Sequence, residues 1–189
     1  MTQVAHKDVV DLLMSQHNQI KELFRQVASS TGDQKRQHFQ DLVRLLAVHE
    51  TAEELVVHPA ARRNINGGEE VVASRLQEED EAKHVLAQLY DMGVDDPRFD
   101  TEFARFAQSV VDHATHEEQD EFRYLRQNLS AEKLQKMAGA VEAAEKTAPT
   151  RPHPNAGESM AANLVAGPPA AVFDRMRDAV RDWHQKNGD

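Results

Sequence analysis

Apolar residues recur at helical spacing in four long segments, and this pattern constrains the fold more than any other feature of the sequence. The segments run from residue 7 to 29, from 33 to about 59 or 63, from 69 to 92 and from 100 to 129. Short polar or glycine-containing stretches separate them. Four helices of this length with short connections are typical of an antiparallel up-down-up-down four-helix bundle, so we expect an all-α fold.

The remainder of the chain predicts a fifth helix, a linker and a terminal helix. Ser130 and the three residues after it have the form of an N-cap followed by good helix formers. Prolines crowd the stretch from 149 to 169, and a narrow apolar stripe follows it. We therefore expect a bundle with a short fifth helix over 1–147, a Pro-rich linker over 148–169, and an amphipathic helix over 170–189.

The composition excludes several classes of protein. The 189 residues include no Cys, which rules out disulfides, thiolate zinc sites and a Cys nucleophile. The formal net charge of -10 disfavours binding to nucleic acid, because such binding gains its energy by neutralising phosphates with Lys and Arg. No stretch is apolar enough for a membrane span or a secretory signal. We expect a cytoplasmic protein with no membrane or nucleic-acid partner.

One six-residue pattern, His-x-Thr-x-Glu-Glu, occurs twice, at 49–54 and at 113–118. A His and a Glu four residues apart lie about one turn apart on the same helix face, so each pair can close on one metal ion. A single pair of this spacing is more often an ion pair on the surface. On a helical wheel, however, His49 and Glu53 fall within roughly 30° of the centre of the apolar arc. Burying an unpaired carboxylate there costs several kcal/mol, which a cation would offset.

The fourth segment places its motif less symmetrically on the same wheel. Glu117 and Glu118 fall about 50° to either side of the apolar centre, Glu121 lies near the centre, and His113 lies at the edge of the arc. His116 points away from the arc, so we expect it to face solvent.

The first segment offers one further candidate, and the third offers two. His17 lies within about 60° of the centre of its apolar face. A single His in such a position is more often a hydrogen-bonded core residue than a metal ligand. In the third segment Glu79 lies inside the apolar arc and His84 nearly opposite, so Glu79 is the preferred ligand candidate and His84 the second choice. An ion pair between Glu79 and Lys83 is the alternative explanation. The sequence gives no supporting pattern for His6, His38, His58, His153 and His184.

Together these positions resemble the hemerythrin-like (HHE) family over about residues 8 to 130. Pro59 and Phe122 follow the paired glutamates in a way that echoes the family's EE…FP pattern. The resemblance implies a four-helix bundle around two iron ions, joined by an oxo or hydroxo bridge and by carboxylates. Matched position by position, the metal ligands would be His17, His49, Glu53, Glu79, His113 and Glu117, with Glu118 and His84 as alternatives.

The third segment departs from the family, because Glu79 stands where a His is usual and Arg75 lies one turn earlier. Such a site has fewer nitrogen ligands and more negative charge, which favours oxidised metal over reversible oxygen carriage. It also leaves a coordination position that water, another carboxylate, Tyr90 or Tyr124 could fill.

The resemblance implies a protein that binds or reacts with dioxygen, peroxide or nitric oxide, as a sensor, a carrier or a peroxide-consuming protein. Whether it has catalase-like or oxidase-like turnover stays open at this point. The alternative is a regulatory or protein-interaction module with a structural metal site. In that case the C-terminal helix would contact a protein partner or a second copy of the chain.

Overall fold

The computed structural model describes residues 8–145, which are helical almost throughout and include no strand. The elements are α1 (Val9–Ser29), α2 (Gly32–Ala52), η1 (Glu53–Val57), α3 (His58–Asn64), α4 (Gly68–Met92), α5 (Phe99–Glu117), η2 (Glu118–Phe122), α6 (Arg123–Asn128) and α7 (Ala131–Glu145). The predicted linker and C-terminal helix lie outside the described residues, as do His6, His153 and His184.

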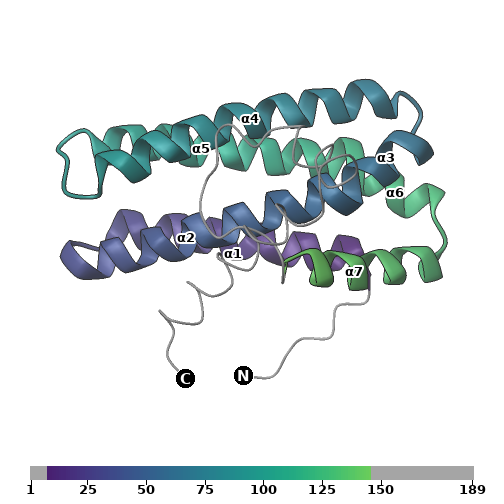
Figure 1. Cartoon of the computed structure of the whole chain (residues 1–189), viewed down its shortest axis with the longest axis horizontal. Helices are drawn as coiled ribbons and strands as arrows, with labels where there is room; N and C mark the ends of the chain where they lie inside the picture. The colour runs from purple at the N-terminus through teal and green to yellow at the C-terminus, as the bar shows by residue number, and fades with distance from the viewer. Residues whose placement is uncertain (1–7, 146–189) are drawn as a thin grey trace, which may run out of the picture.

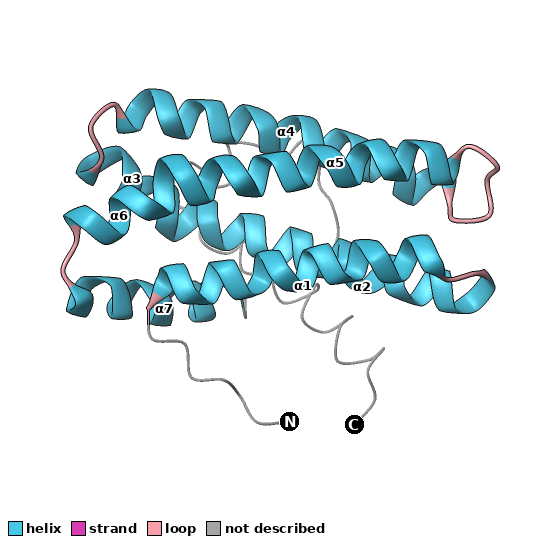
Figure 2. Ribbon diagram, turned by 180° about the vertical axis from the view of Figure 1, so that it is seen from behind, coloured by secondary structure: helices cyan, strands magenta, loops and turns pink. Residues whose placement is uncertain are grey.

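Four helical rods and one shorter helix make up the described part of the chain, which confirms the predicted all-α bundle. The segments α2, η1 and α3 form one continuous rod, and α5, η2 and α6 form another. In Figure 1, α4 and α5 lie above α1 and α2, and consecutive rods run in opposite directions. Figure 2 shows α7 at the end of the lower layer, where it packs against α1 and α2. No described helix combines the length and apolar character that crossing a membrane requires.

Local sequence signals explain where these rods begin and end. Asp8 caps α1, since its side chain accepts a hydrogen bond from the backbone N–H of Asp11 at 3.0 Å. Gly67 has a φ of 69° at the tight turn before α4, and Gly93 has a φ of 76° just after it. Only glycine adopts this left-handed backbone without strain.

The core consists of two apolar clusters with a polar layer between them. The cluster beside α7 includes Leu13, Ala52, Val57, Val72 and Phe122. The other includes Ile20, Leu46, Leu86, Val110 and a group of phenylalanines. On each of the four rods, the preferred ligand candidates lie at or next to the point where the chain passes from one cluster to the other. Apolar packing at both ends therefore keeps the middle layer away from solvent.

Each copy of the repeated motif is followed by a π-helical turn. The backbone N–H of His58 donates to the carbonyl oxygen of Glu53, and that of Arg123 donates to Glu118. These bonds span five residues instead of the four of an α-helix, so each turn contains one extra residue. Such π-bulges often lie at functional sites.

Candidate metal centre

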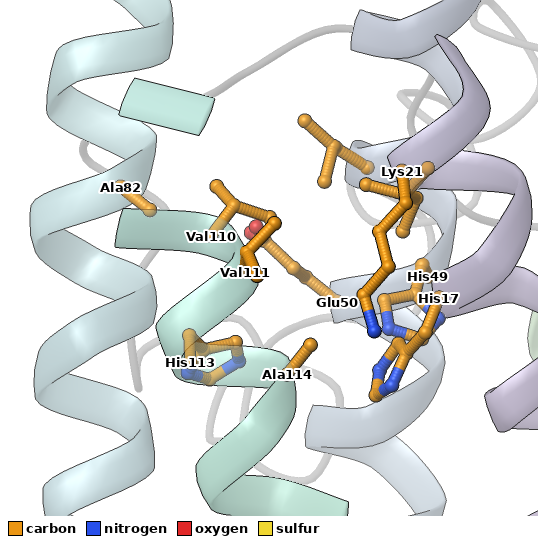
Figure 3. A pocket seen from close by; sticks show the side chains of 11 residues that line it. His17, Lys21, His49, Glu50, Ala82, Val110, Val111, His113 and Ala114 are labelled. Carbon is orange, nitrogen blue, oxygen red and sulfur yellow. The ribbon is translucent and has the colours of Figure 1, made fainter. Parts of the chain in front are cut away.

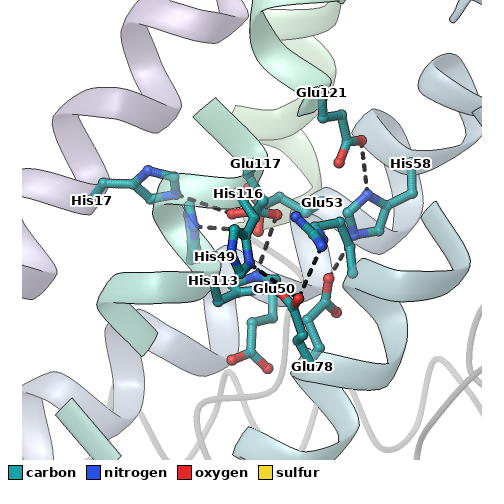
Figure 4. A network of polar contacts seen from close by, with 12 residues as sticks. His17, His49, Glu50, Glu53, His58, Glu78, His113, His116, Glu117 and Glu121 are labelled. Atoms are coloured by element: carbon teal, nitrogen blue, oxygen red, sulfur yellow. Dashed lines mark hydrogen bonds and ion pairs between the residues drawn. The ribbon is translucent and has the colours of Figure 1, made fainter. Parts of the chain in front are cut away.

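A layer of buried histidines and glutamates crosses the middle of the bundle (Figure 4). These residues come from every long rod and are at most 3% exposed: His17, His49, Glu53, His58, Glu79, Glu117 and Glu121. His113 completes the layer from α5, with its side chain 12% exposed.

Two groups of potential ligands within this layer share two carboxylates. The first consists of His17, His49, Glu53 and Glu117, and the second of Glu53, Glu79, His113 and Glu117. Within each group the ligand atoms lie within 4.8 Å of one another. Since Glu53 and Glu117 belong to both groups, the arrangement suits two neighbouring cations bridged by these two carboxylates.

The two oxygens of Glu117 face histidines on opposite sides. Its Oε2 lies 3.3 Å from His17 Nε2, and its Oε1 lies 3.4 Å from His113 Nε2. In the other motif, Glu53 Oε2 lies 3.2 Å from His49 Nε2. All three histidines therefore turn Nε2 toward the shared carboxylates.

The opposite ring nitrogen of each of these histidines has an outer partner. His17 Nδ1–H donates to Glu118 at 2.9 Å. His49 Nδ1–H donates to the side-chain oxygen of Gln16 at 2.7 Å. His113 Nδ1–H donates to Glu78 at 2.9 Å. These bonds fix the ring orientation and place the proton on Nδ1, which leaves the Nε2 lone pair free for a metal.

Several buried polar atoms in the layer make no hydrogen bond. They include His17 Nε2, His113 Nε2, Glu79 Oε2, and both carboxylate oxygens of Glu53 and of Glu117. Buried polar groups are normally hydrogen-bonded, because leaving one unpaired costs roughly 1 to 3 kcal/mol. Here the unpaired atoms are the imidazole nitrogens and carboxylate oxygens that iron, manganese and zinc accept as ligands. The residues present therefore fit a metal centre.

Burial and mutual repulsion perturb the protonation of the layer. Burial raises the pKa of Glu53 well above its ordinary value, with repulsion from Glu117 adding to the effect. Burial also lowers the pKa of His49 to about 3, helped by the neighbouring His17. For Glu117, the attraction of His113 and His17 outweighs burial and holds its pKa well below the usual range. A bound cation would favour the ionised form of Glu53 and so oppose this rise of its pKa.

The alternatives suggested by the sequence lie outside this layer. The His84 side chain is 51% exposed, and its Nδ1–H donates to the backbone oxygen of Asp80. Glu118 is partly exposed and contacts His17 from its outer side. Tyr90 and Tyr124 are 39% and 40% exposed, so neither reaches the layer to fill a coordination position.

Glu79 forms the ion pair with Lys83 that was its alternative explanation, and it also lies among the potential metal ligands. Lys83 Nζ lies 3.6 Å from Glu79 Oε2 and 3.9 Å from Glu50 Oε2, and it contacts Glu54 more closely. Burial raises the pKa of Glu50 to about 8 despite the attraction of Lys83. Lys83 therefore adds a positive charge beside the second group of potential ligands.

His58 is the residue that the sequence interpretation missed. The sequence gives it no supporting pattern, but it is 1% exposed and lies between two buried carboxylates. Its Nε2 lies 2.6 Å from Glu79 Oε1, and its Nδ1 lies 2.9 Å from Glu121 Oε1. Burial lowers the pKa of His58, but the two carboxylates outweigh this and raise it well above the usual value. The one signal in the sequence was its place directly before Pro59, where the family's EE…FP pattern has Phe.

Glu121 was placed near the apolar centre by the sequence, without a role as a ligand. It is fully buried, and its Oε2 makes no hydrogen bond. His58, Glu117 and Glu121 form a third group whose ligand atoms lie within 4.8 Å of one another.

A small cavity opens beside the first group of ligands (Figure 3). Its volume is about 20 Å³, which is room for one water-sized molecule. His17, His49 and His113 contribute to its wall, with Glu50 and Lys21. Aliphatic side chains supply the remainder: Ile20, Leu46, Ala82, Val110, Val111 and Ala114.

Comparison with known proteins agrees with this geometry. The model of the hemerythrin HHE cation binding domain matches residues 8–125. An uncharacterized hemerythrin-like protein from Schizosaccharomyces pombe is 27% identical over 177 residues, which cover 93% of this chain and 87% of the relative. A DNA nickase from a Nostoc species is 29% identical over 139 residues, which cover 73% of this chain but 39% of the nickase.

A solved structure has the same fold. The crystal structure of a hemerythrin HHE cation binding domain-containing protein from Mycobacterium kansasii aligns with a TM-score of 0.66 at 19% identity. The alignment covers 88% of this chain and 98% of that one.

Proposed function

Because the chain belongs to the hemerythrin HHE cation-binding family, we propose that it holds two iron ions in the buried layer and binds or reacts with a small oxidant there. One observation carries the proposal: the two groups of potential ligands share Glu53 and Glu117. Two adjacent sites joined by two carboxylates suit a dinuclear centre. Bound iron would supply the redox chemistry with dioxygen, peroxide or nitric oxide.

The protein's own residues would divide between the two ions. His17 and His49 would hold the first ion, and Glu79 and His113 the second. Glu53 and Glu117 would bridge the two and offset their charge. Two divalent ions carry four positive charges, and the layer contains four buried carboxylates: Glu53, Glu79, Glu117 and Glu121. This balance supports occupation by a pair of cations, because buried charges persist in proteins only when they are paired.

The cavity supports a small ligand instead of a large substrate. Its volume of about 20 Å³ admits one molecule of the size of water. Three of the proposed ligands, His17, His49 and His113, line it, so a molecule bound there would lie beside the metal centre. The aliphatic wall limits water around it, which affects the redox potential of a metal site.

The Nostoc relative, named a DNA nickase, raises the question of a nucleic-acid substrate. This chain covers 39% of that protein, so the remainder of the nickase has no counterpart in the match. The net charge of -10 also opposes binding to a phosphate backbone. The proposal therefore stays with a small oxidant.

Iron loading followed by an oxidant challenge tests the function. Protein reconstituted with ferrous iron under argon should develop visible absorption on exposure to oxygen, and should consume added peroxide in proportion to its iron content. A His49→Ala variant should lose both properties, whereas His84→Ala, which removes an exposed His, should keep them. Loaded protein that leaves oxygen, peroxide and nitric oxide unchanged and shows no spectral response to any of them would refute the reactive role.

A further inference from the structure

Three predicted metal ligands share one pattern of contacts. In His17, His49 and His113, Nε2 faces a buried carboxylate at 3.2 to 3.4 Å. Their Nδ1 donates to an outer side-chain oxygen at 2.7 to 2.9 Å. Two ligands bound at right angles to one ion, each at about 2.1 Å, lie about 3 Å apart. The Nε2 contacts thus have the spacing of neighbouring ligands around an ion.

His58 has the same two-sided arrangement of carboxylate and outer partner, but its Nε2 lies closer to the buried carboxylate and makes a hydrogen bond with it. Its Nε2 faces Glu79 Oε1 at 2.6 Å, and its Nδ1 donates to Glu121 Oε1 at 2.9 Å. Its ring is as buried as that of His17, and one of its nitrogens lies within 4.8 Å of ligand atoms of Glu121 and of Glu117, one of the shared carboxylates. Glu121 corresponds to the outer partners Glu118 and Glu78 in this comparison.

We propose that His58 is a ligand of the second ion, together with Glu79 and His113. The inference rests on the proposed dinuclear site and names a ligand that neither the repeated motif nor the helical wheel assigned. On binding, Nε2 would give up its proton to solvent and offer its lone pair to the ion. Nδ1 would keep its proton and its bond to Glu121.

This assignment gives each ion two nitrogen ligands. Without His58, the first ion would have His17 and His49, whereas the second would have only His113 beside three carboxylates. With His58 the two positions match, although α4 supplies no histidine to the layer. The helix that follows the first motif would then provide the nitrogen that the third rod lacks. The π turn makes this possible, since it brings residue 58 back to the face of Glu53.

The competing role is outer support, in which His58 only donates to Glu79 and orients it. The two roles predict different NMR signals from the imidazole N–H of His58 when a paramagnetic metal is bound. A ligand imidazole bound to paramagnetic cobalt gives a strongly shifted signal from its exchangeable N–H, whereas a ring one bond further out does not. Losing an outer partner typically lowers metal affinity 10- to 100-fold, so losing a ligand should lower it further.

The experiment uses the full chain loaded with Co²⁺ and proton NMR. Wild type should bind two cobalt ions and show four shifted exchangeable signals, one each from His17, His49, His58 and His113. His58→Phe should lose one signal and bind the second ion more than about 100-fold more weakly. Glu121→Gln keeps an oxygen acceptor for Nδ1–H and should keep all four signals. His84→Phe is the matched control for removing a histidine.

The outcomes separate this inference from the proposed function. Two bound ions with three signals in wild type, unchanged in His58→Phe, would overturn the ligand role of His58 and leave the dinuclear site intact. This comparison does not depend on whether a variant folds, because wild type alone gives the count. A wild-type chain that binds no cobalt, iron or manganese would overturn the proposed function itself. Recovery of the second ion in His58→Gly on addition of free imidazole would support direct ligation.

Discussion

The backbone N–H of His58 donates to the carbonyl oxygen of Glu53 across a π-helical turn. In a regular α-helix, five residues would turn His58 about 140° away from Glu53. The wider turn instead returns His58 to the buried layer, where it contacts Glu79 and Glu121. A second π turn begins at the last residue of the second motif and contains Glu121. The repeated motif is thus coupled to a repeated backbone irregularity that adds polar groups to the same layer.

Glu53→Gln should stabilise the metal-free protein and weaken metal binding. Glu53 is fully buried, neither of its oxygens makes a hydrogen bond, and its pKa is raised well above the usual value. Replacing it with a neutral side chain of similar shape removes the cost of protonating the carboxylate or of burying its charge. We expect the free energy of unfolding at pH 7 with chelator to rise by roughly 1 to 3 kcal/mol. Urea unfolding measures this change, and a lower stability of the variant would count against unpaired burial of Glu53.

Metal removal should destabilise wild type far more than Glu53→Gln. A ligand that binds only the folded state adds about 4 kcal/mol when its free concentration is 1,000 times the Kd. Thermal unfolding with cobalt and with excess chelator measures the difference. Glu81→Gln, on the exposed face of α4, is the matched control and should respond like wild type. Equal responses of wild type and Glu53→Gln would show that the stabilising metal binds elsewhere.

Gly68→Ala and Gly139→Ala should change stability in opposite directions. A Cβ at position 68 would lie 2.5 Å from the backbone oxygen of Ala61, so the start of α4 would have to move away from α3. A Cβ at position 139 meets nothing within 4 Å, on a helix where Ala is favoured over Gly by roughly 0.5 to 1 kcal/mol. We expect Gly68→Ala to cost about 1 to 3 kcal/mol. Chemical denaturation of both variants provides the comparison, and a neutral Gly68→Ala would contradict the close packing.

The Asp8 cap of α1 should stabilise the folded state less in acid than at pH 7. Partial burial raises the pKa of Asp8, but the backbone N–H of Asp11 and the Arg126 guanidinium outweigh this, so its pKa is lowered. The folded state therefore binds the Asp8 proton less readily than the unfolded state, and the stabilisation is present above the unfolded pKa and is lost as pH falls through the lower, folded-state pKa.

Asp8→Ala should cost about 1 kcal/mol at pH 7, and less near pH 3. Asp8→Asn keeps a capping oxygen without the charge, so its cost should be smaller and nearly independent of pH. Stability curves of the three proteins from pH 3 to 7 test this. A pH-independent cost of Asp8→Ala would indicate that the charge contributes nothing.

The sequence predicted most of the fold because each rod has its own apolar period. The predicted ends of the first and third helices lie close to those observed, and the second rod continues through Pro59 to Asn64. The wheel also placed His49 and Glu53 on the apolar face, since the α-helix runs unbroken from His49 to the start of the π turn at Glu53. The sequence contains no supporting pattern for His58, and a wheel with a constant 100° per residue does not describe its position, because the π turn breaks that spacing.

The helical wheel describes one helix at a time and so does not predict contacts between helices. Glu117 and Glu118 were equivalent on the wheel, but only Glu117 points to the centre, while Glu118 contacts His17 on α1. Which of the two turns inward depends on the rotation and axial register of α5 against α1. The outer partners Gln16 and Glu78 also cannot be predicted from one helix, since each contacts a histidine on another rod.

The iron content of the full chain tests the central claim most directly. Protein loaded anaerobically with ferrous iron, passed over a desalting column and measured by mass spectrometry of the elements should hold about two irons per chain, as the shared ligands Glu53 and Glu117 imply. Paired replacement of Glu53 and Glu117 by Ala should abolish binding of both ions, while paired replacement of the exposed Glu81 and His84 should leave it unchanged. A wild-type chain that retains one iron or none under these conditions would contradict the dinuclear centre.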